Sequence, residues 1–281
     1  MAASYRKEYT MKRVNRFLGV FLCALVICTI IMPTAAYAAS TSWIDTSASA
    51  NGYFTVCYNQ DTAVKMKVGI TFNGKPTFHD YTHGETSNYV FTQGDGNYTI
   101  TLYRNVRGTS YAVAATTTAS VSMQNEFAPY LASTAEITFS ADDSVGKKAA
   151  ELCGAFKDDA ARVVAIHNFI SQNFTYNYDF AGQISSGKIT NYVPDTQDIL
   201  SGKNGICYDF SSLFAAMCRS QEIPCKIQKG YYNGIYHAWN LVYVNDAWQA
   251  VDTTASVGKK LNAASFADCV ISEAASLHYK Y

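Results

Sequence analysis

Three residues in the C-terminal half of the chain could together carry out nucleophilic catalysis. Cys207 lies in the stretch NGICYDF, His237 in YHAWN and Asp252 in WQAVD. A thiolate can attack an acyl carbon, an imidazole can move the proton, and a carboxylate can hold the imidazole in one tautomer. These side chains can act only if the elements that carry them bring them together.

The residues after Cys207 predict a helix that begins close to this cysteine, between Gly205 and the helix-stopping Pro224. Four apolar residues follow the spacing of a buried helical face: Phe210, Leu213, Phe214 and Met217. A thiol in the first helical turn lies near unpaired backbone N–H groups and the positive end of the helix dipole, and both favour the thiolate. The alternative interpretation is an inert buried cysteine.

The segment that contains His237 and Asp252 predicts a hairpin with a two-residue loop at Asn245-Asp246. In this register His237 faces Thr254, and Asp252 becomes a diagonal neighbour of His237 on the same face, about 7 to 8 Å away at Cα. A four-residue loop keeps this arrangement. A loop of three or five residues puts the two side chains on opposite faces.

A second turn, at Asn233-Gly234, precedes this hairpin and places Gly230 opposite His237. A glycine at the opposed position leaves room beside the imidazole. We therefore expect a small antiparallel sheet that carries the imidazole and the carboxylate, with a helix that brings Cys207 against it.

An acyl-transfer site also needs hydrogen-bond donors for the oxyanion. The backbone N–H of Cys207 is one candidate, and the side-chain candidates are Tyr176, Tyr178 and Gln197. Each of these three side chains could equally pack or face solvent. Asp209 is close to the predicted helix start, so we expect it to interact with the helix dipole and not to act as a catalyst.

Three further aromatic or imidazole side chains fit structural roles. Trp239 and Trp248 are expected to wall the site or to fill the core, because indole has no acid–base role near neutral pH. His167 falls on the apolar face of a helix that Asp158 and Asp159 would start. A lone imidazole on such a face is expected to be a satisfied core residue.

From Thr41 to about Met123 the sequence shows the period-two alternation of β-strands. Apolar and polar residues alternate in 64–72 and again in 98–102. Short strands of this kind predict an all-β, immunoglobulin-like sandwich. Its Tyr-rich strands could bind a sugar or a cell-wall polymer, but aromatic residues are also good sheet formers. His79 and His83 are expected in a loop, exposed to solvent.

Residues 1–38 have the composition of a signal peptide. Basic residues precede the apolar run 17–32, and Ala36-Tyr37-Ala38 supplies the small residues that a signal peptidase accepts. The run is shorter than the ~20 residues that span a bilayer comfortably, so an uncleaved anchor is the weaker alternative. We expect an exported protein, secreted or at the cell surface, without stable membrane insertion after cleavage.

Composition and cysteine spacing disfavour several classes of partner. The 22 basic and 22 acidic residues cancel, so nucleic acid is not an expected partner. Of eight cysteines, Cys23 and Cys28 fall in the predicted signal peptide, and the others form no CxxC pair. No metal or other cofactor is predicted. If one thiol is catalytic, an odd number is left, which disfavours a disulfide framework, although Cys218 and Cys225 could form a bridge.

The three motifs, Gly-x-Cys at Cys207, His-Ala-Trp at His237 and Trp-x-x-Val-Asp at Asp252, resemble in order and spacing those of the transglutaminase-like superfamily. The resemblance covers residues 146–256. It implies a papain-like α+β core with Cys207 as nucleophile, His237 as base and Asp252 as the third member. Glu222 stands where many relatives have glycine before Ile-Pro, which leaves the conformation of this turn open.

The combined prediction is an α+β protein in which a papain-like transglutaminase core follows an all-β sandwich. The expected parts are a signal peptide (1–38), the β-sandwich (39–123), a linker (124–145) and the catalytic domain (146–281). We expect a thioester acyl-enzyme to form from a carboxamide or peptide bond of a protein or peptide substrate, for example one of the cell wall or cell surface.

The acceptor of the acyl group is open, because a lysine amine and water would use the same three residues. Transfer to lysine would make the protein a cross-linking acyltransferase, and transfer to water an amidase or cysteine protease. The alternative from another class is a cell-surface binding or adhesion protein. Such a protein would work through the sandwich and keep the catalytic fold as a scaffold.

Overall fold

The computed structural model describes residues 43–60, 64–190, 192–232 and 234–271, and the backbone of 276–280. The predicted signal peptide lies outside the described residues. The described residues all belong to one compact unit, and the boundaries predicted within it stay predictions. In the part of the chain that is described, each helix is too short or too polar to cross a membrane.

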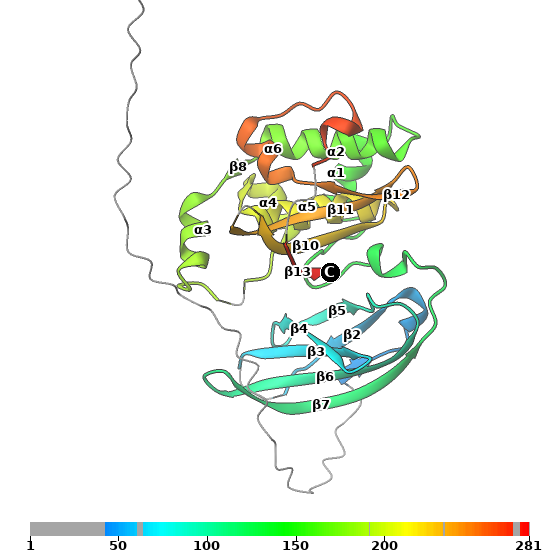
Figure 1. The fold of residues 1–281 in the computed structure, drawn as a ribbon, viewed down its shortest axis with the longest axis vertical. Helices are drawn as coiled ribbons and strands as arrows, with labels where there is room; N and C mark the ends of the chain where they lie inside the picture. Colours follow the sequence, from blue (N-terminus) through cyan, green and yellow to red (C-terminus); the bar gives the residue numbers. More distant parts are fainter. Residues whose placement is uncertain (1–42, 61–63, 191, 233, 272–275, 281) are drawn as a thin grey trace, which may run out of the picture. The chain divides into compact units, whose positions relative to one another are not determined.

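The first part of this unit consists almost entirely of strands. Its elements are β1 (Ile44–Asp45), η2 (Ser49–Asn51), β2 (Tyr53–Cys57), β3 (Met66–Phe72), β4 (Lys75–Tyr81), β5 (Thr86–Val90), β6 (Gly96–Arg107) and β7 (Ser110–Val121). They form two antiparallel sheets, β1-β2-β5 and β4-β3-β6-β7 (Figure 1). Apolar side chains from both sheets, such as Phe54 and Ile100, share one core. The immunoglobulin-like assignment stays a prediction.

The prediction that His79 lies in a loop is wrong. His79 belongs to β4, where it pairs with Val68 of β3, and its ring packs edge-on against Tyr89. The alternation of β4 was missed because its sequence, KPTFHDY, mixes a proline and charged residues with the apolar ones. His83 does lie in the turn after β4, but its Nε2 donates to the carbonyl of Gln60 over 2.8 Å.

The rest of the unit mixes helices and strands. Its elements are η3 (Ala128–Tyr130), α1 (Ser144–Cys153), α2 (Asp159–Asn173), β8 (Thr175–Tyr176), α3 (Tyr178–Ser185), α4 (Thr196–Gly202), β9 (Asn204–Gly205), α5 (Cys207–Ser220), β10 (Cys225–Tyr232), β11 (Ile235–Val244), β12 (Ala247–Val251), α6 (Thr253–Lys259), η4 (Phe266–Asp268) and β13 (Ser276–Lys280). An antiparallel sheet has the order β12-β11-β10-β13, and the short β8 and β9 pair in parallel.

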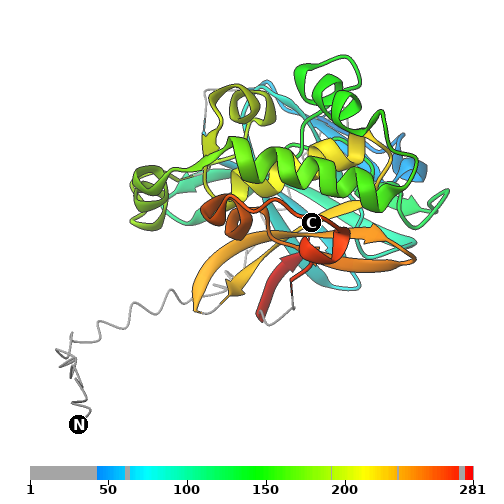
Figure 2. The same cartoon turned by 90° about the horizontal axis from the view of Figure 1, so that it is seen from above.

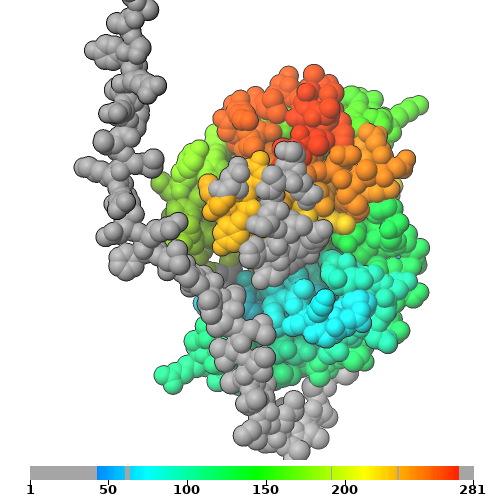
Figure 3. All heavy atoms as spheres, in the orientation of Figure 1, coloured from blue at the N-terminus to red at the C-terminus, as the bar shows by residue number. Residues whose placement is uncertain are grey.

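Helix α5 is the centre of this mixed part. It contacts α1, α2, α4 and α6 as well as β10 and β11, and Figure 2 shows α2, in green, lying across it. As the periodicity predicted, the four apolar residues of its stripe are fully buried. In the space-filling view, the segment from α6 to η4, orange to red, forms a continuous surface beside β12 (Figure 3). The helix therefore lies in a closed core on one face of the sheet.

Three local predictions in this region can be compared with the structure. His167 of α2 is fully buried and hydrogen bonds with Ser256 through Nε2 over 2.8 Å, which confirms a satisfied core residue. Cys218 and Cys225 are both free, so no disulfide bridge joins them. Glu222 has a φ of 62°. The turn forms in this left-handed conformation, which glycine adopts without steric cost.

The loop between β11 and β12 has two residues, Asn245 and Asp246, both with positive φ, as the predicted register requires. However, the ladder ends at the pair Asn240 and Val251. Asp252 leaves the strand to cap α6, which begins at Thr253. The predicted pairing of His237 with Thr254 is therefore wrong. The predicted pairing of Gly230 with His237 across β10 and β11 is confirmed.

Candidate active site

Cys207 is the first residue of α5 and is partly exposed. The chain before it is fixed by Asp209, whose Oδ2 accepts the backbone N–H of Ile206 over 2.8 Å and whose Oδ1 accepts the hydroxyl of Tyr192 over 2.6 Å. A Cβ on Gly205 would come within 2.7 Å of the Cβ of Asp209, so this approach needs glycine. Asp209 thus caps the helix that presents the thiol, as expected from its position.

His237 lies on β11 with its side chain almost enclosed. Its Nε2 donates to Oδ2 of Asp252 over 2.9 Å, and its ring is nearly parallel to that of Trp239, with centroids 6.2 Å apart. The opposed residue on β10, Gly230, has no side chain to compete for this space. Trp239 is itself buried, so the indole holds one face of the imidazole in place.

Asp252 is held from two directions. Its Oδ1 accepts the backbone N–H groups of Thr254 at 3.0 Å and Ala255 at 3.3 Å, at the start of α6. Its Oδ2 accepts the hydrogen bond from Nε2 of His237. The side chain is only 5% exposed, so the carboxylate has a fixed orientation and little access to water. The helix cap and the hydrogen bond to the imidazole therefore position each other.

The surroundings of His237 favour its protonated form. Burial by itself lowers the pKa of His237, but hydrogen bonds to Asp252 and to Cys207, together with their charges, raise it to about 10. The ring can therefore hold a proton near neutral pH beside the sulfur. This arrangement can stabilise a thiolate and afterwards donate a proton to a leaving group.

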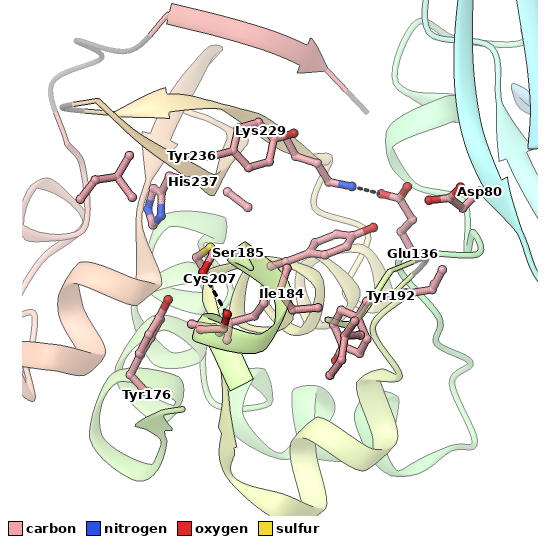
Figure 4. A pocket seen from close by; sticks show the side chains of 18 of the residues that line it. Asp80, Glu136, Tyr176, Ile184, Ser185, Tyr192, Cys207, Lys229, Tyr236 and His237 are labelled. Carbon is pink, nitrogen blue, oxygen red and sulfur yellow. Dashed lines mark hydrogen bonds and ion pairs between the residues drawn. The ribbon is translucent and has the colours of Figure 1, made fainter. Parts of the chain in front are cut away.

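The side-chain candidates for the oxyanion hole do not all lie near the sulfur. Tyr176 lines the same cavity as Cys207, as Figure 4 shows, and burial raises the pKa of its hydroxyl to about 12. The hydroxyl therefore stays a donor. Tyr178 is 78% exposed and does not line the cavity. Gln197 is exposed on α4, where its Oε1 accepts from the hydroxyl of Ser144 over 3.3 Å.

Cys207 and His237 lie at one end of a cavity of about 760 Å³. The cavity also has walls that the sequence interpretation missed, from β4, from the connection before α1, from α3 and from β10 (Figure 4). No local motif marks these residues as site residues. They meet only because segments that are far apart in the sequence converge on the same space.

A partly buried ion pair lies at the other end of this cavity. Nζ of Lys229, on β10, donates to Oε2 of Glu136 over 3.0 Å, and the same ammonium lies 3.7 Å from the ring centroid of Tyr208. Burial opposes the ionisation of Glu136, but the charge of Lys229 keeps the pKa of this carboxyl below its usual value. The two charges therefore neutralise each other inside the cavity wall.

No metal centre forms within the described ranges, because nowhere do three His, Cys, Asp or Glu side chains come together as ligands. Trp248, the other tryptophan considered from the sequence, lies away from the sulfur. Its ring packs on Tyr130 and Phe127, and Nζ of Lys226 lies 3.6 Å from its centroid. Trp248 therefore fills the contact between the sheet and the connection around η3.

The family model described as the transglutaminase-like superfamily matches residues 147–253. This segment is a transglutaminase-like core. Cys207, His237 and Asp252 all lie inside it, whereas β4 and Glu136 lie before it. The cavity at the transglutaminase-like core is thus completed by a part of the chain that the family model does not cover. No curated protein matches the chain.

Three solved structures match the chain at low sequence identity and low structural similarity. A crystal structure of a TGase has 18% identity and a TM-score of 0.34, and the match covers 39% of this chain and 30% of that one. A candidate cysteine protease from Cytophaga hutchinsonii has 17% identity and a TM-score of 0.40, with coverages of 82% and 91%. The periplasmic domain of TgpA from Pseudomonas aeruginosa has 12% identity and a TM-score of 0.37, with coverages of 74% and 91%.

Proposed function

We propose that the protein is an exported thiol enzyme that acts on amide bonds of protein or peptide substrates, for example at the cell wall or cell surface. The observation that carries this proposal is the chain of contacts from α5 to α6. Cys207 lies beside an imidazole whose Nε2 is held by Asp252, and Asp252 is itself fixed by backbone N–H groups of α6. Nucleophile, base and orienting carboxylate are the parts that acyl transfer needs.

In the first step, Sγ of Cys207 attacks the amide carbonyl and a C–S bond forms. The backbone N–H of Cys207 and the hydroxyl of Tyr176 are the proposed donors to the oxyanion. When the C–N bond breaks, His237 gives its proton to the leaving nitrogen, and a thioester remains on Cys207. A raised pKa suits His237 to hold this proton until it is needed.

In the second step, an acceptor attacks the thioester carbonyl and passes a proton to His237 as the C–S bond breaks. Water gives a carboxylic acid, and a lysine amine gives a new amide. Mass spectrometry of a glutamine-containing peptide, incubated with and without a primary amine, separates these outcomes. Deamidation in both samples supports hydrolysis, and amine incorporation supports transfer.

The proposal is tested first by alkylation with iodoacetamide at neutral pH, read by mass spectrometry. Cys207 should react faster than Cys57, which is the other partly exposed thiol among the described residues and serves as an internal control. His237→Ala should lower the rate at Cys207 about tenfold or more and leave Cys57 unchanged. Equal rates at the two thiols in the wild type would contradict the proposal.

A binding or adhesion protein that keeps this fold as a scaffold is the competing function. It predicts that attachment to cell surfaces survives Cys207→Ala and that Cys207 has no special reactivity. The immunoglobulin-like nature of the N-terminal sheets and the cleavage of residues 1–38 are parts of the present proposal. N-terminal sequencing of the exported protein tests the cleavage site.

A further inference from the structure

The cavity at Cys207 reaches the N-terminal sheets. Phe78, His79 and Asp80, three consecutive residues of β4, line it together with Cys207 and His237. The ring of Phe78 is 43% exposed although it is a large apolar side chain. Figure 4 shows Cys207 near His237 at one end of the space and Asp80 toward the other end. An apolar ring left open beside a cavity can contact whatever the cavity binds.

The proposed chemistry sets the direction of a bound substrate. The leaving nitrogen takes its proton from His237, so the part of the substrate that leaves must lie on the side of the imidazole. The acyl part stays on the sulfur and extends the other way, toward the end of the cavity where Asp80 and Glu136 lie (Figure 4). The β4 end of the cavity thus faces the acyl donor.

The charges in this part of the wall are already paired. Lys229 binds Glu136 over 3.0 Å, and Asp80 binds Lys67 over 2.7 Å. His79 is partly buried, and burial lowers its pKa to about 4, so it is neutral near pH 7. A charged substrate group would have to compete with these contacts.

Several other side chains that line the cavity are apolar or aromatic: Phe78, Ile184, Ile189, Tyr192 and Val193. They come from β4, from α3 and from the segment that follows α3. A cavity of about 760 Å³ is of the size that drug-sized ligands occupy, which is more than a small amide fills. An apolar side chain in this region would remove its own surface and that of Phe78 from water.

We infer that β4 forms part of the acyl-donor site and that the donor is a polypeptide segment with a bulky apolar side chain on the acyl side of the bond. This inference rests on the proposed function. It assigns substrate selection to a strand that precedes the transglutaminase-like core, with Phe78 as its exposed apolar contact and Ile189 as a second apolar side chain that lines the cavity.

The test uses irreversible thiol reagents of two sizes on the full chain. Tripeptidyl chloromethyl ketones carry Phe or Asp at each of three positions in turn, with Gly at the others. Sγ of Cys207 displaces chloride from the reagent, the C–S bond forms, and the thiol proton is released. Each rate is divided by the rate with iodoacetamide, which is too small to reach β4 and reports the thiol alone.

The wild type should react at least tenfold faster with Phe than with Asp at one or more positions. Phe78→Ala should reduce this ratio at least threefold. Val113→Ala, which truncates a half-exposed apolar side chain of β7 that does not line the cavity, should leave the ratio unchanged. If Phe78→Ala fails to fold, Ile189→Ala should reduce the ratio through a second lining side chain, from the segment after α3.

Two results would overturn the inference. One is a ratio close to one, or a preference for Asp, at all three positions in the wild type. The other is a preference for Phe that both cavity variants retain. If iodoacetamide does not favour Cys207 over Cys57, the proposed function fails and the inference fails with it. Fast iodoacetamide labelling of Cys207 without selectivity among the peptide reagents would contradict the inference and leave the proposed function standing.

Discussion

The two ends of the cavity each hold a partly buried histidine, and the two imidazoles have opposite electrostatic surroundings. Burial lowers the pKa of His79 to about 4. Burial acts in the same direction on His237, yet hydrogen bonds to Asp252 and Cys207 and their charges raise its pKa to about 10. Burial alone therefore does not decide whether a histidine in this cavity is charged.

The difference comes from how nearby carboxylates are used. At His237 the carboxylate of Asp252 accepts directly from the ring over 2.9 Å. Near His79 the carboxylates of Glu136 and Asp80 are each bound to a lysine, so their effects on the pKa of His79 are opposed by those of the lysines. A carboxylate that is already paired contributes little against desolvation.

The largest expected effect comes from removing Asp252, the carboxylate that makes the electrostatic surroundings of His237 differ from those of His79. Asp252→Ala should lower the rate of acylation by roughly 10³ to 10⁴, because His237 loses both its orientation and its charge partner. The pKa of His237 should fall toward the lowered pKa of His79. NMR titration of the ring protons can follow this change. The control Asp80→Ala should change the acylation rate much less. A pKa of His237 that stays near 10 in Asp252→Ala would contradict this account.

The second prediction concerns stability above neutral pH. The pKa of His237 is higher in the folded state than its ordinary value of 6.5. Its contribution to the free energy of unfolding is therefore complete below pH 6.5 and is lost as the pH rises toward 10. Urea unfolding should show a loss of about 1–4 kcal/mol over this range. His237→Gln should show a smaller loss.

The third prediction is the opposite pH dependence at the other end of the cavity. The pKa of His79 is lower in the folded state than 6.5, so the unfolded chain binds the proton first. The free energy of unfolding should carry no penalty from His79 above pH 6.5. It should fall by about 1–3 kcal/mol as the pH drops toward 4. His79→Phe should flatten this acid limb of the urea unfolding curve and leave the alkaline limb in place. An unchanged acid limb would show that other groups cause it.

The smallest expected effect tests whether the lysines hold the pKa of His79 down. Lys229→Met removes a charge that lowers this pKa and leaves Glu136, which raises it. NMR titration should then show the pKa of His79 higher by roughly one unit. Lys67→Met should move it in the same direction but less, because Lys67 is the weaker of the two effects. A downward shift in either variant would contradict this assignment.

The parts of the site that the sequence predicted are those with a local signal. The start of α5 at Cys207 follows from an apolar stripe, and the turn after Val244 follows from an Asn-Asp pair. Asp252 also lies in a local signal, but the predicted hairpin register treats it as a strand residue. An aspartate before Thr-Thr-Ala-Ser is also a typical helix cap, and the helix took precedence over the ladder.

The far end of the cavity had no such signal. Glu136 and Lys229 are 93 residues apart in sequence, and neither lies in a motif. The strand that carries Phe78 and His79 breaks the apolar and polar alternation, so it was not recognised as a strand. Contacts of this kind follow from how the elements converge, and a pattern within one segment does not contain that information.

The double use of Asp252 has an evolutionary consequence. Its carboxylate starts α6 as well as orienting His237, so a descendant that had abandoned catalysis would still be selected to keep this aspartate for folding. Its presence in a related sequence is thus weak evidence of activity. Cys207 is only the first residue of α5, whose start is capped by Asp209, so retention of this thiol is the more informative mark of a working lineage.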